Sequence, residues 1–198
     1  MEHWNLQLFL LLNAASPPGR LALDVAWMLA QGAIWLVPAG LVLAWLRGAR
    51  GAREAVLIAA LAGALALGAN GLIGLAWYHP RPAEAGIGHA WLAHMRDSSF
   101  PSDHLALMWA VAFVLLLWPR ARRIGAAFAA LGLPVAWARI YLGVHFPLDM
   151  AGSVLVAAAS AAAACAAAPA VVAAAMPPLV RVHRTLFSGF INKGWIHE

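Results

Sequence analysis

Long apolar runs, separated by short clusters of arginine, fill most of this 198-residue sequence. Five runs approach or exceed the roughly 20 helical residues needed to cross a hydrocarbon core of about 30 Å: approximately 21–46, 55–78, 101–118, 124–144 and 147–176. Hydrophobic residues make up 64% of the chain and charged residues 11%, against about 25% charged in an ordinary soluble domain. So few charges cannot cover so much apolar surface in water. We therefore predict an all-α, polytopic membrane helix bundle with about five transmembrane helices.

The third run is the shortest, because only the 14 residues 105–118 are continuously apolar. A helix over this run reaches spanning length only if it begins at Pro101. The first turn of that helix is then polar, so we expect polar groups at this end of the membrane.

Both ends of the chain lie outside these runs. Residues 3–13 are too short to span and predict a helix at the membrane surface. Glu2, with no Lys or Arg beside it, is the wrong flank for a cleaved signal peptide. We expect a single membrane-embedded domain over residues 1–198, with its core at 21–176 and a cytoplasmic tail at 177–198.

The basic residues predict which face of the bundle meets the cytoplasm. Nine of the 13 Lys and Arg residues lie after the first, third or fifth run, and in a five-span chain these regions share one side. The positive-inside rule assigns that side to the cytoplasm. We expect these residues to be solvated there: Arg47, Arg50, Arg53, Arg120, Arg122, Arg123, Arg181, Arg184 and Lys193. The net charge of +5 does not predict nucleic-acid binding, because the arginines form no single basic face.

The opposite face gathers polar residues from three separate parts of the sequence. Arg81 follows the second run, the segment 97–104 precedes the third, and the segment 139–149 ends the fourth. Convergence of Arg, His and Asp at one face is typical of a functional site. Arginine suits phosphate oxygens, because its planar fork of donors stays charged. Arg139 lies about 9 Å into its helix, counted from His145 at 1.5 Å per residue, where it is costly unless it is paired, functional or snorkels to the interface.

Two local patterns in this region suggest chemistry. The segment 98–104 is typical of a helix start, whose N–H groups at Ser102, Asp103 and His104 can receive an anion; the alternative is that its serines only cap the helix. His145 and Asp149 are four residues apart, so the carboxylate can reach back to the imidazole. Such a contact fixes the tautomer and leaves the other ring nitrogen as a nucleophile, although an isolated pair is more often structural.

The order and spacing of these residues resemble the motif of the type 2 phosphatidic acid phosphatase superfamily, which runs Lys-x6-Arg-Pro, Pro-Ser-Gly-His and Ser-Arg-x5-His-x3-Asp. The stretches 97–104 and 139–149 are also similar to the bacterial bacitracin-resistance undecaprenyl-pyrophosphate phosphatases. The likeness extends over roughly residues 5–160. The matching positions are Arg81-Pro82, Pro101 to His104, Arg139, His145 and Asp149.

The resemblance implies a metal-independent phosphatase of the bacterial inner membrane, without cofactor, whose site faces the exterior and acts on undecaprenyl pyrophosphate. It implies that His145 is the nucleophile, oriented by Asp149, and that a phosphohistidine forms. It implies that His104 protonates the leaving group and later activates water. The phosphate-binding residues it implies are Arg81, Ser102 and Arg139.

Three positions depart from the superfamily pattern. Gly74 stands where the lysine belongs, Asp103 where the glycine belongs, and Ala138 where the serine belongs. Asp103 fits the bacitracin-resistance subgroup, whereas the missing lysine removes a phosphate-binding cation. Asn70 and His79 lie near the same end and are possible secondary site residues.

Three other functions compete with this prediction. A phosphatase for phosphatidylglycerol phosphate or lipid A uses the same motifs. A transporter or binding protein for polyprenyl lipids is the non-enzymatic alternative, although its path requires polar groups at mid-depth. A metal hydrolase is the third, but its candidate ligands lack a recognisable zinc spacing: His79, Asp103, His104, His145 and Asp149.

Overall fold

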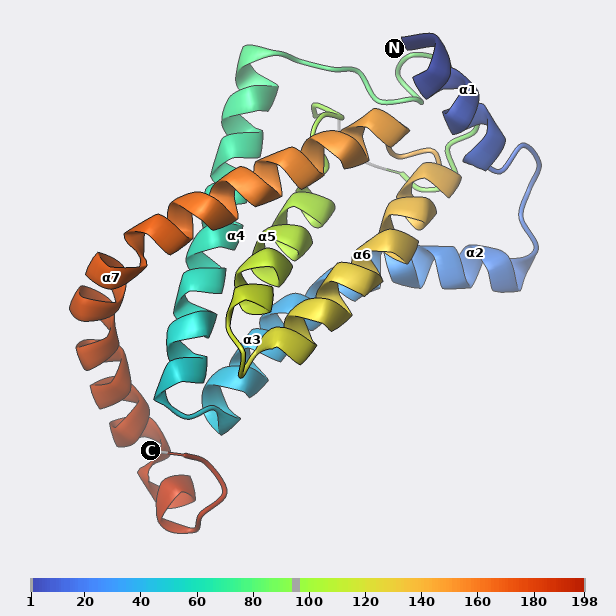
Figure 1. Ribbon diagram of the computed structural model, residues 1–198. Helices are drawn as coiled ribbons and strands as arrows, with labels where there is room; N and C mark the ends of the chain where they lie inside the picture. The colour runs from blue at the N-terminus through green and yellow to red at the C-terminus, as the bar shows by residue number, and fades with distance from the viewer. Residues whose placement is uncertain (1, 94–96, 198) are drawn as a thin grey trace.

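The computed structural model describes residues 2–93 and 97–197, and every regular element in these two ranges is a helix (Figure 1). The predicted all-α bundle is confirmed. Four helical stretches, with Arg20–Arg47 counted as one, are long and apolar enough to cross a membrane in this described part of the chain. The elements are α1 (Glu2–Leu12), α2 (Arg20–Trp27), the π-helix η1 (Met28–Gly32), the 3-10 helix η2 (Ala33–Trp35), α3 (Leu36–Arg47), α4 (Arg50–Ala76), α5 (Asp103–Leu117), α6 (Arg122–Tyr141) and α7 (Pro147–Asn192).

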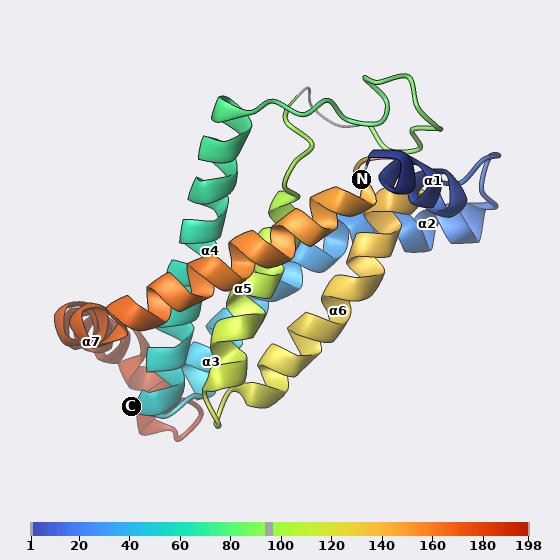
Figure 2. The same cartoon turned by 45° about the horizontal axis from the view of Figure 1, so that its top comes forward.

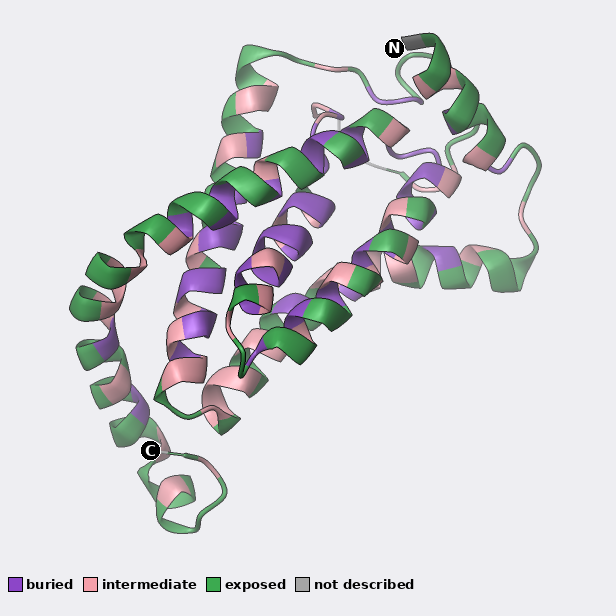
Figure 3. Ribbon diagram, in the orientation of Figure 1, coloured by how far each residue is buried: buried purple, intermediate pink, exposed green. Residues whose placement is uncertain are grey.

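Helix α5 packs against α4, α6 and α7 and is the most enclosed helix of the bundle (Figures 1 and 3). Nine of its 15 residues are buried. At 1.5 Å per residue it is about 22 Å long, shorter than the hydrocarbon core of about 30 Å. The prediction that this helix begins at Pro101 is wrong, because it begins at Asp103. The preceding segment, 97–102, is non-helical, and Ser99, Pro101 and Ser102 within it are buried in the protein.

Small residues allow α5 and α6 to approach closely. A Cβ on Gly125 would lie 2.7 Å from the backbone nitrogen of Leu116, so only glycine fits there. Helix α7 turns a buried stripe of small side chains, Ala157, Ala161 and Ala164, toward the bundle. Small-residue packing of this kind is typical of membrane helices.

The first apolar run forms one irregular span, Arg20–Arg47, instead of a continuous α-helix. The π-helix η1 and the 3-10 helix η2 separate α2 from α3. Single π-helical turns are frequent at functional sites. Here η1 contains Ala30, whose carbonyl oxygen accepts a hydrogen bond from Arg139.

Helix α7 is much longer than predicted. It was expected to end near residue 176 and give way to a tail, but it continues to Asn192. Its 46 residues correspond to about 69 Å, more than twice the hydrocarbon thickness. The helix bends (Figures 1 and 2) and contains Pro169, Pro177 and Pro178, which remove backbone hydrogen bonds. The second half of α7 therefore turns toward the start of α4.

The short helix predicted at residues 3–13 is present as α1, and it packs on the junction between α6 and α7 (Figure 2). The rings of Phe9 and Phe146 lie 5.1 Å apart. Asn13 Nδ2 donates to the backbone oxygen of Tyr141 at 3.1 Å and to that of His89 at 2.9 Å. These contacts tie α1 and the long loop after α4 to the end of the bundle that holds the candidate site.

Candidate active site

His145 lies in the short segment between α6 and α7, and only 1% of its surface is exposed. Its Nδ1 is 2.8 Å from the backbone oxygen of Ser99 and 3.1 Å from Asp149 Oδ2. A carbonyl oxygen can only accept a hydrogen bond, so Nδ1 must carry the proton in the neutral ring. The other nitrogen, Nε2, therefore has the lone pair. The contact with Asp149 that the spacing predicted is present, and it leaves Nε2 as the nucleophilic atom.

Two arginines meet the Nε2 of His145. Arg81 NH1 lies 3.2 Å from this nitrogen and Arg139 NH2 lies 3.1 Å from it. Guanidinium groups only donate, so both contacts agree with a lone pair on Nε2. A phosphoryl group bound to Nε2 would lie between two planar forks of donors. Arginine forks of this kind match phosphate oxygens in geometry and charge.

Arg139 is almost completely buried, with 1% of its surface exposed. Its NH1 donates to the backbone oxygen of Ala30 in η1 at 2.9 Å, while NH2 meets His145. The side chain thus points into the protein, and the snorkelling alternative is not what the structure has. The irregular first span provides the carbonyl that fixes this guanidinium.

Arg81 is held by the loop that connects α4 to α5. Its Nε and NH2 lie 2.9 and 2.8 Å from Asp97 Oδ1, and its NH1 donates to the backbone oxygen of Val144 at 3.0 Å. Its backbone N–H donates to Glu84 Oε2 at 3.3 Å. The same carboxylate accepts from the hydroxyl of Tyr78 at 2.5 Å, a hydrogen bond that raises the pKa of Tyr78. The loop therefore positions one of the two guanidinium groups.

Ser99 is a site residue that the sequence patterns did not single out except as a helix cap. Its hydroxyl donates to Asp149 Oδ2, and its backbone oxygen accepts from His145 Nδ1. Asp149 Oδ2 also accepts the backbone N–H of Phe146 at 2.8 Å. Ser99 is fully buried. It thus fixes the carboxylate and the imidazole together, but 50 residues separate Ser99 from Asp149 in the sequence, so no local spacing could have revealed the contact.

Ser102 is buried at the start of α5, and its backbone N–H donates to Ser153 Oγ at 2.9 Å. The expectation that this N–H is available to an anion is therefore wrong. Its side-chain oxygen, in contrast, makes no hydrogen bond with any described residue. A buried hydroxyl without a partner is costly, and a phosphoryl oxygen is one partner that removes the cost. Ser153, on α7, is a second residue that the sequence patterns missed.

The remaining candidates occupy more peripheral positions. His104 lies in the first turn of α5 and is half-buried. Asp103 is exposed, and its Oδ1 accepts from Asn70 Nδ2 at 2.8 Å. His79 packs edge-on against Phe146, with ring centres 6.0 Å apart, and its Nδ1 is buried without a described partner. The roles of these residues stay predictions.

The position of the superfamily lysine lines a cavity that also borders Asp97, the partner of Arg81. Gly74 lines a space of about 360 Å³ between α4 and the start of α5, together with Asn70 and Asp103. A Cβ on Gly74 would lie 3.1 Å from the Cβ of Ser98. Asn70 binds Asp103 and the backbone oxygen of Pro101, so its described contacts brace the start of α5.

A metal ion at the histidine would meet the two arginines. No group of three or more His, Cys, Asp or Glu suited to hold a metal occurs among residues 2–93 and 97–197. A cation on Nε2 of His145 would lie directly beside Arg81 and Arg139, and like charges at this range repel. The geometry thus favours an anion at Nε2.

Comparison with known proteins gives the class. The model of the PAP2 superfamily matches residues 55–172. The chain belongs to this superfamily, as the motifs suggested, and is a multi-pass membrane phosphatase.

The individual relatives narrow the class further. The chain is 34% identical over 198 residues, 100% of both chains, to YbjG of Escherichia coli (strain K12), a proposed undecaprenyl-diphosphatase. It is 39% identical over 113 residues to undecaprenyl-diphosphatase BcrC of Bacillus subtilis (strain 168), which covers 57% of this chain and 58% of that one. The crystal structure of Aquifex aeolicus LpxE is similar with a TM-score of 0.67 and 27% identity over 82% of this chain and 94% of that one.

Proposed function

We propose that this protein hydrolyses undecaprenyl pyrophosphate to undecaprenyl phosphate and inorganic phosphate. The observation that carries the proposal is the environment of the His145 ring. Ser99 and Asp149 accept from Nδ1, which leaves the lone pair on Nε2, and Arg81 and Arg139 lie beside Nε2. The relatives named as undecaprenyl-diphosphatases support this choice of substrate.

The first step is an attack of His145 Nε2 on the terminal phosphorus. A bond forms between nitrogen and phosphorus, and the bond from phosphorus to the bridging oxygen breaks. The lipid phosphate leaves with a proton from His104. Asp149 stabilises the imidazolium, while Arg81, Arg139 and the hydroxyl of Ser102 bind the phosphoryl oxygens as charge develops.

The second step hydrolyses the phosphohistidine and regenerates the free enzyme. His104 takes a proton from a water molecule, the water oxygen attacks the phosphohistidine, and the nitrogen–phosphorus bond breaks to give inorganic phosphate. The positive field comes from two guanidinium groups, so we propose that the reaction needs no metal. Full turnover in excess chelator is expected, and a loss restored by a divalent ion would contradict this part.

The substrate is tested by turnover of purified protein on undecaprenyl pyrophosphate, phosphatidylglycerol phosphate and lipid A phosphates. The proposal predicts preference for the polyprenyl substrate and increased bacitracin tolerance upon overexpression. Preference for a glycerolipid, with unchanged bacitracin tolerance, would contradict the proposed substrate but not the phosphatase activity. Polyprenyl lipid movement without phosphate release would favour the transporter.

We also propose that the site faces the exterior of the bacterial inner membrane, as the distribution of arginine predicts. Cys165 is the only cysteine and is first replaced by alanine. A cysteine at the exposed Ala93 should then react with an impermeant thiol reagent in intact cells, and one at Gly51 should not. The opposite labelling would reverse the orientation.

A further inference from the structure

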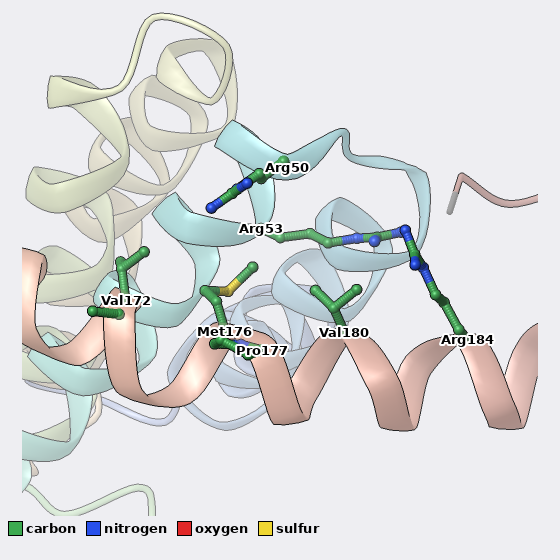
Figure 4. Close-up of a pocket in the computed structure, with 8 residues that line it drawn as sticks. Arg50, Arg53, Val172, Met176, Pro177, Val180 and Arg184 are labelled. Atoms are coloured by element: carbon green, nitrogen blue, oxygen red, sulfur yellow. The ribbon is translucent and has the colours of Figure 1, made fainter.

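A second group of arginines has no part in the proposed reaction. It surrounds a cavity of about 410 Å³ between the start of α4 and the second half of α7 (Figure 4). Arg53 and Gly74 are 21 residues apart on α4, which places this cavity about 32 Å from the level of the site. That is about the thickness of the hydrocarbon core. The cavity therefore lies at the other membrane face. Its lining consists of Arg50, Arg53, Val172, Ala173, Met176, Pro177, Val180 and Arg184.

The polar part of the cavity is built around Arg53, which is 1% exposed although the sequence predicted a solvated residue. The extended second half of α7 covers it. Its Nε donates to the backbone oxygen of Trp45 at 3.1 Å, and its NH2 donates to that of His197 at 2.7 Å. Figure 4 shows Arg53 and Arg184 reaching toward each other from α4 and α7. An anion placed between two guanidinium groups is attracted by both.

Arg50 adds a more flexible positive charge at the rim. Its side chain is 84% exposed and its Nε lies 3.2 Å from Glu54 Oε1. Exposed pairs of this kind contribute little free energy, so Arg50 can turn to a ligand at low cost. All three charged residues among the described lining are thus arginines, one of them buried.

The other wall of the cavity is apolar. Val172, Met176 and Val180 follow one another at four-residue intervals on α7, so they form one stripe along the helix (Figure 4). A ligand that satisfies both walls needs an anionic head and a hydrocarbon chain. Inorganic phosphate satisfies only the arginines.

We propose that this cavity binds the phosphate headgroup of an anionic phospholipid from the leaflet opposite to the catalytic site. The phosphate lies between Arg53 and Arg184, with Arg50 at the rim. The first methylene groups of an acyl chain pack along Val172, Met176 and Val180. The binding joins α4 to the second half of α7.

Native mass spectrometry of the purified protein in detergent tests this proposal. The protein is titrated with phosphatidylglycerol and, separately, with phosphatidylcholine. The double variant Arg50→Gln/Arg184→Gln leaves the buried Arg53 in place. Arg181→Gln is the matched control, because Arg181 is an exposed arginine of the same helix that does not line the cavity.

The wild-type protein is expected to bind phosphatidylglycerol more tightly than phosphatidylcholine. At about fivefold per arginine, the double variant should bind phosphatidylglycerol about 25-fold more weakly, and the control should match the wild type. Turnover of the double variant shows that it is folded. The proposal would be overturned if the double variant bound phosphatidylglycerol as tightly as the wild type, or if the control lost as much affinity as the double variant. If excess inorganic phosphate displaces the lipid from the wild-type protein but not from the double variant, the cavity is a site for free phosphate, and the lipid proposal is wrong.

Discussion

Two buried histidine–arginine contacts lie at opposite ends of the bundle. His145 Nε2 is 3.1 Å from Arg139 NH2 at the site, and His183 Nε2 is 2.8 Å from Arg53 NH2 at the other end. The difference lies at the second ring nitrogen. His145 Nδ1 faces the acceptors Asp149 and Ser99, whereas His183 Nδ1 accepts from the indole N–H of Trp45 at 3.3 Å.

The direction of these hydrogen bonds decides what each ring can do. An indole N–H and a guanidinium both only donate, so both ring nitrogens of His183 face donors, Trp45 at Nδ1 and Arg53 at Nε2. The contacts of His183 therefore do not fix its proton on Nδ1. The contacts of His145 do, and they present its lone pair between two arginines. A buried arginine beside a histidine is thus not enough to make the histidine a nucleophile. The hydrogen-bond acceptors at Nδ1 of His145 leave the lone pair on Nε2.

The largest expected effect separates the two histidines. His145→Asn removes the proposed nucleophile and should lower kcat by on the order of 10⁴-fold or more, as removal of a covalent nucleophile does. His183→Asn should keep kcat within about twofold, because a conservative change at a structural position acts on stability. Both are measured as phosphate release from undecaprenyl pyrophosphate. Equal losses in the two variants would break the comparison.

The arginines come next. Arg139→Lys keeps the charge but loses the planar fork, and loss of one transition-state donor typically costs about 10²–10³-fold in kcat. Arg53→Lys makes the same change at the other end and should lower Tm while leaving kcat near the wild-type value. Steady-state kinetics and thermal unfolding of both variants measure the contrast. A normal kcat in Arg139→Lys would show that the planar guanidinium of Arg139 is not needed in the transition state.

Ser99 should give an intermediate effect, because it acts through Asp149 and His145. Ser99→Ala removes a hydrogen bond to a carboxylate, which is worth about 1.5–3 kcal/mol, so we expect kcat to fall by about 10–100-fold. KM should stay unchanged, because the described contacts of Ser99 in the site are with Asp149 and His145. Ser99→Thr keeps the hydroxyl and should recover most of the activity. A change confined to KM would contradict a positioning role.

Asn70 should give the smallest effect. It lies on α4, like Arg53, but at the site end, where it donates to Asp103 Oδ1. Asn70→Ala should lower kcat by about fivefold or less, because one hydrogen bond of about 1 kcal/mol to the start of α5 is lost. Kinetics on undecaprenyl pyrophosphate measure it. A loss as large as that of Arg139→Lys would mean that Asn70 replaces the missing lysine at the phosphate.

Features that depend on local spacing could be predicted from the sequence. The apolar runs predicted the bundle, and the four-residue interval between His145 and Asp149 predicted their contact. The alternation of the apolar runs placed Arg81 at the same membrane face as His145, and the motif order, which resembles a known superfamily, placed both in one site although 64 residues separate them.

Features that depend on distant packing could not be predicted. The roles of Ser99 and Ser153 arise from contacts across about 50 residues. Arg53 was expected in a solvated loop, and it is buried because α7 continues past residue 176 and packs over it. Helix α5 begins at Asp103 and not at Pro101, and its enclosure by α4, α6 and α7 also depends on contacts between distant parts of the chain.

The central claim, that His145 Nε2 carries the phosphoryl group, is tested most directly by trapping the intermediate. In His104→Asn, attack can proceed on a pyrophosphate with a good leaving group, while hydrolysis slows because the proposed base for water is absent. Substrate labelled with ³²P at the terminal phosphate should leave one equivalent of base-stable, acid-labile label on this variant. Peptide mapping should place the label on His145 at Nε2, and the double variant with His145→Asn should carry none. Label on any other residue, or on Nδ1, would contradict the account.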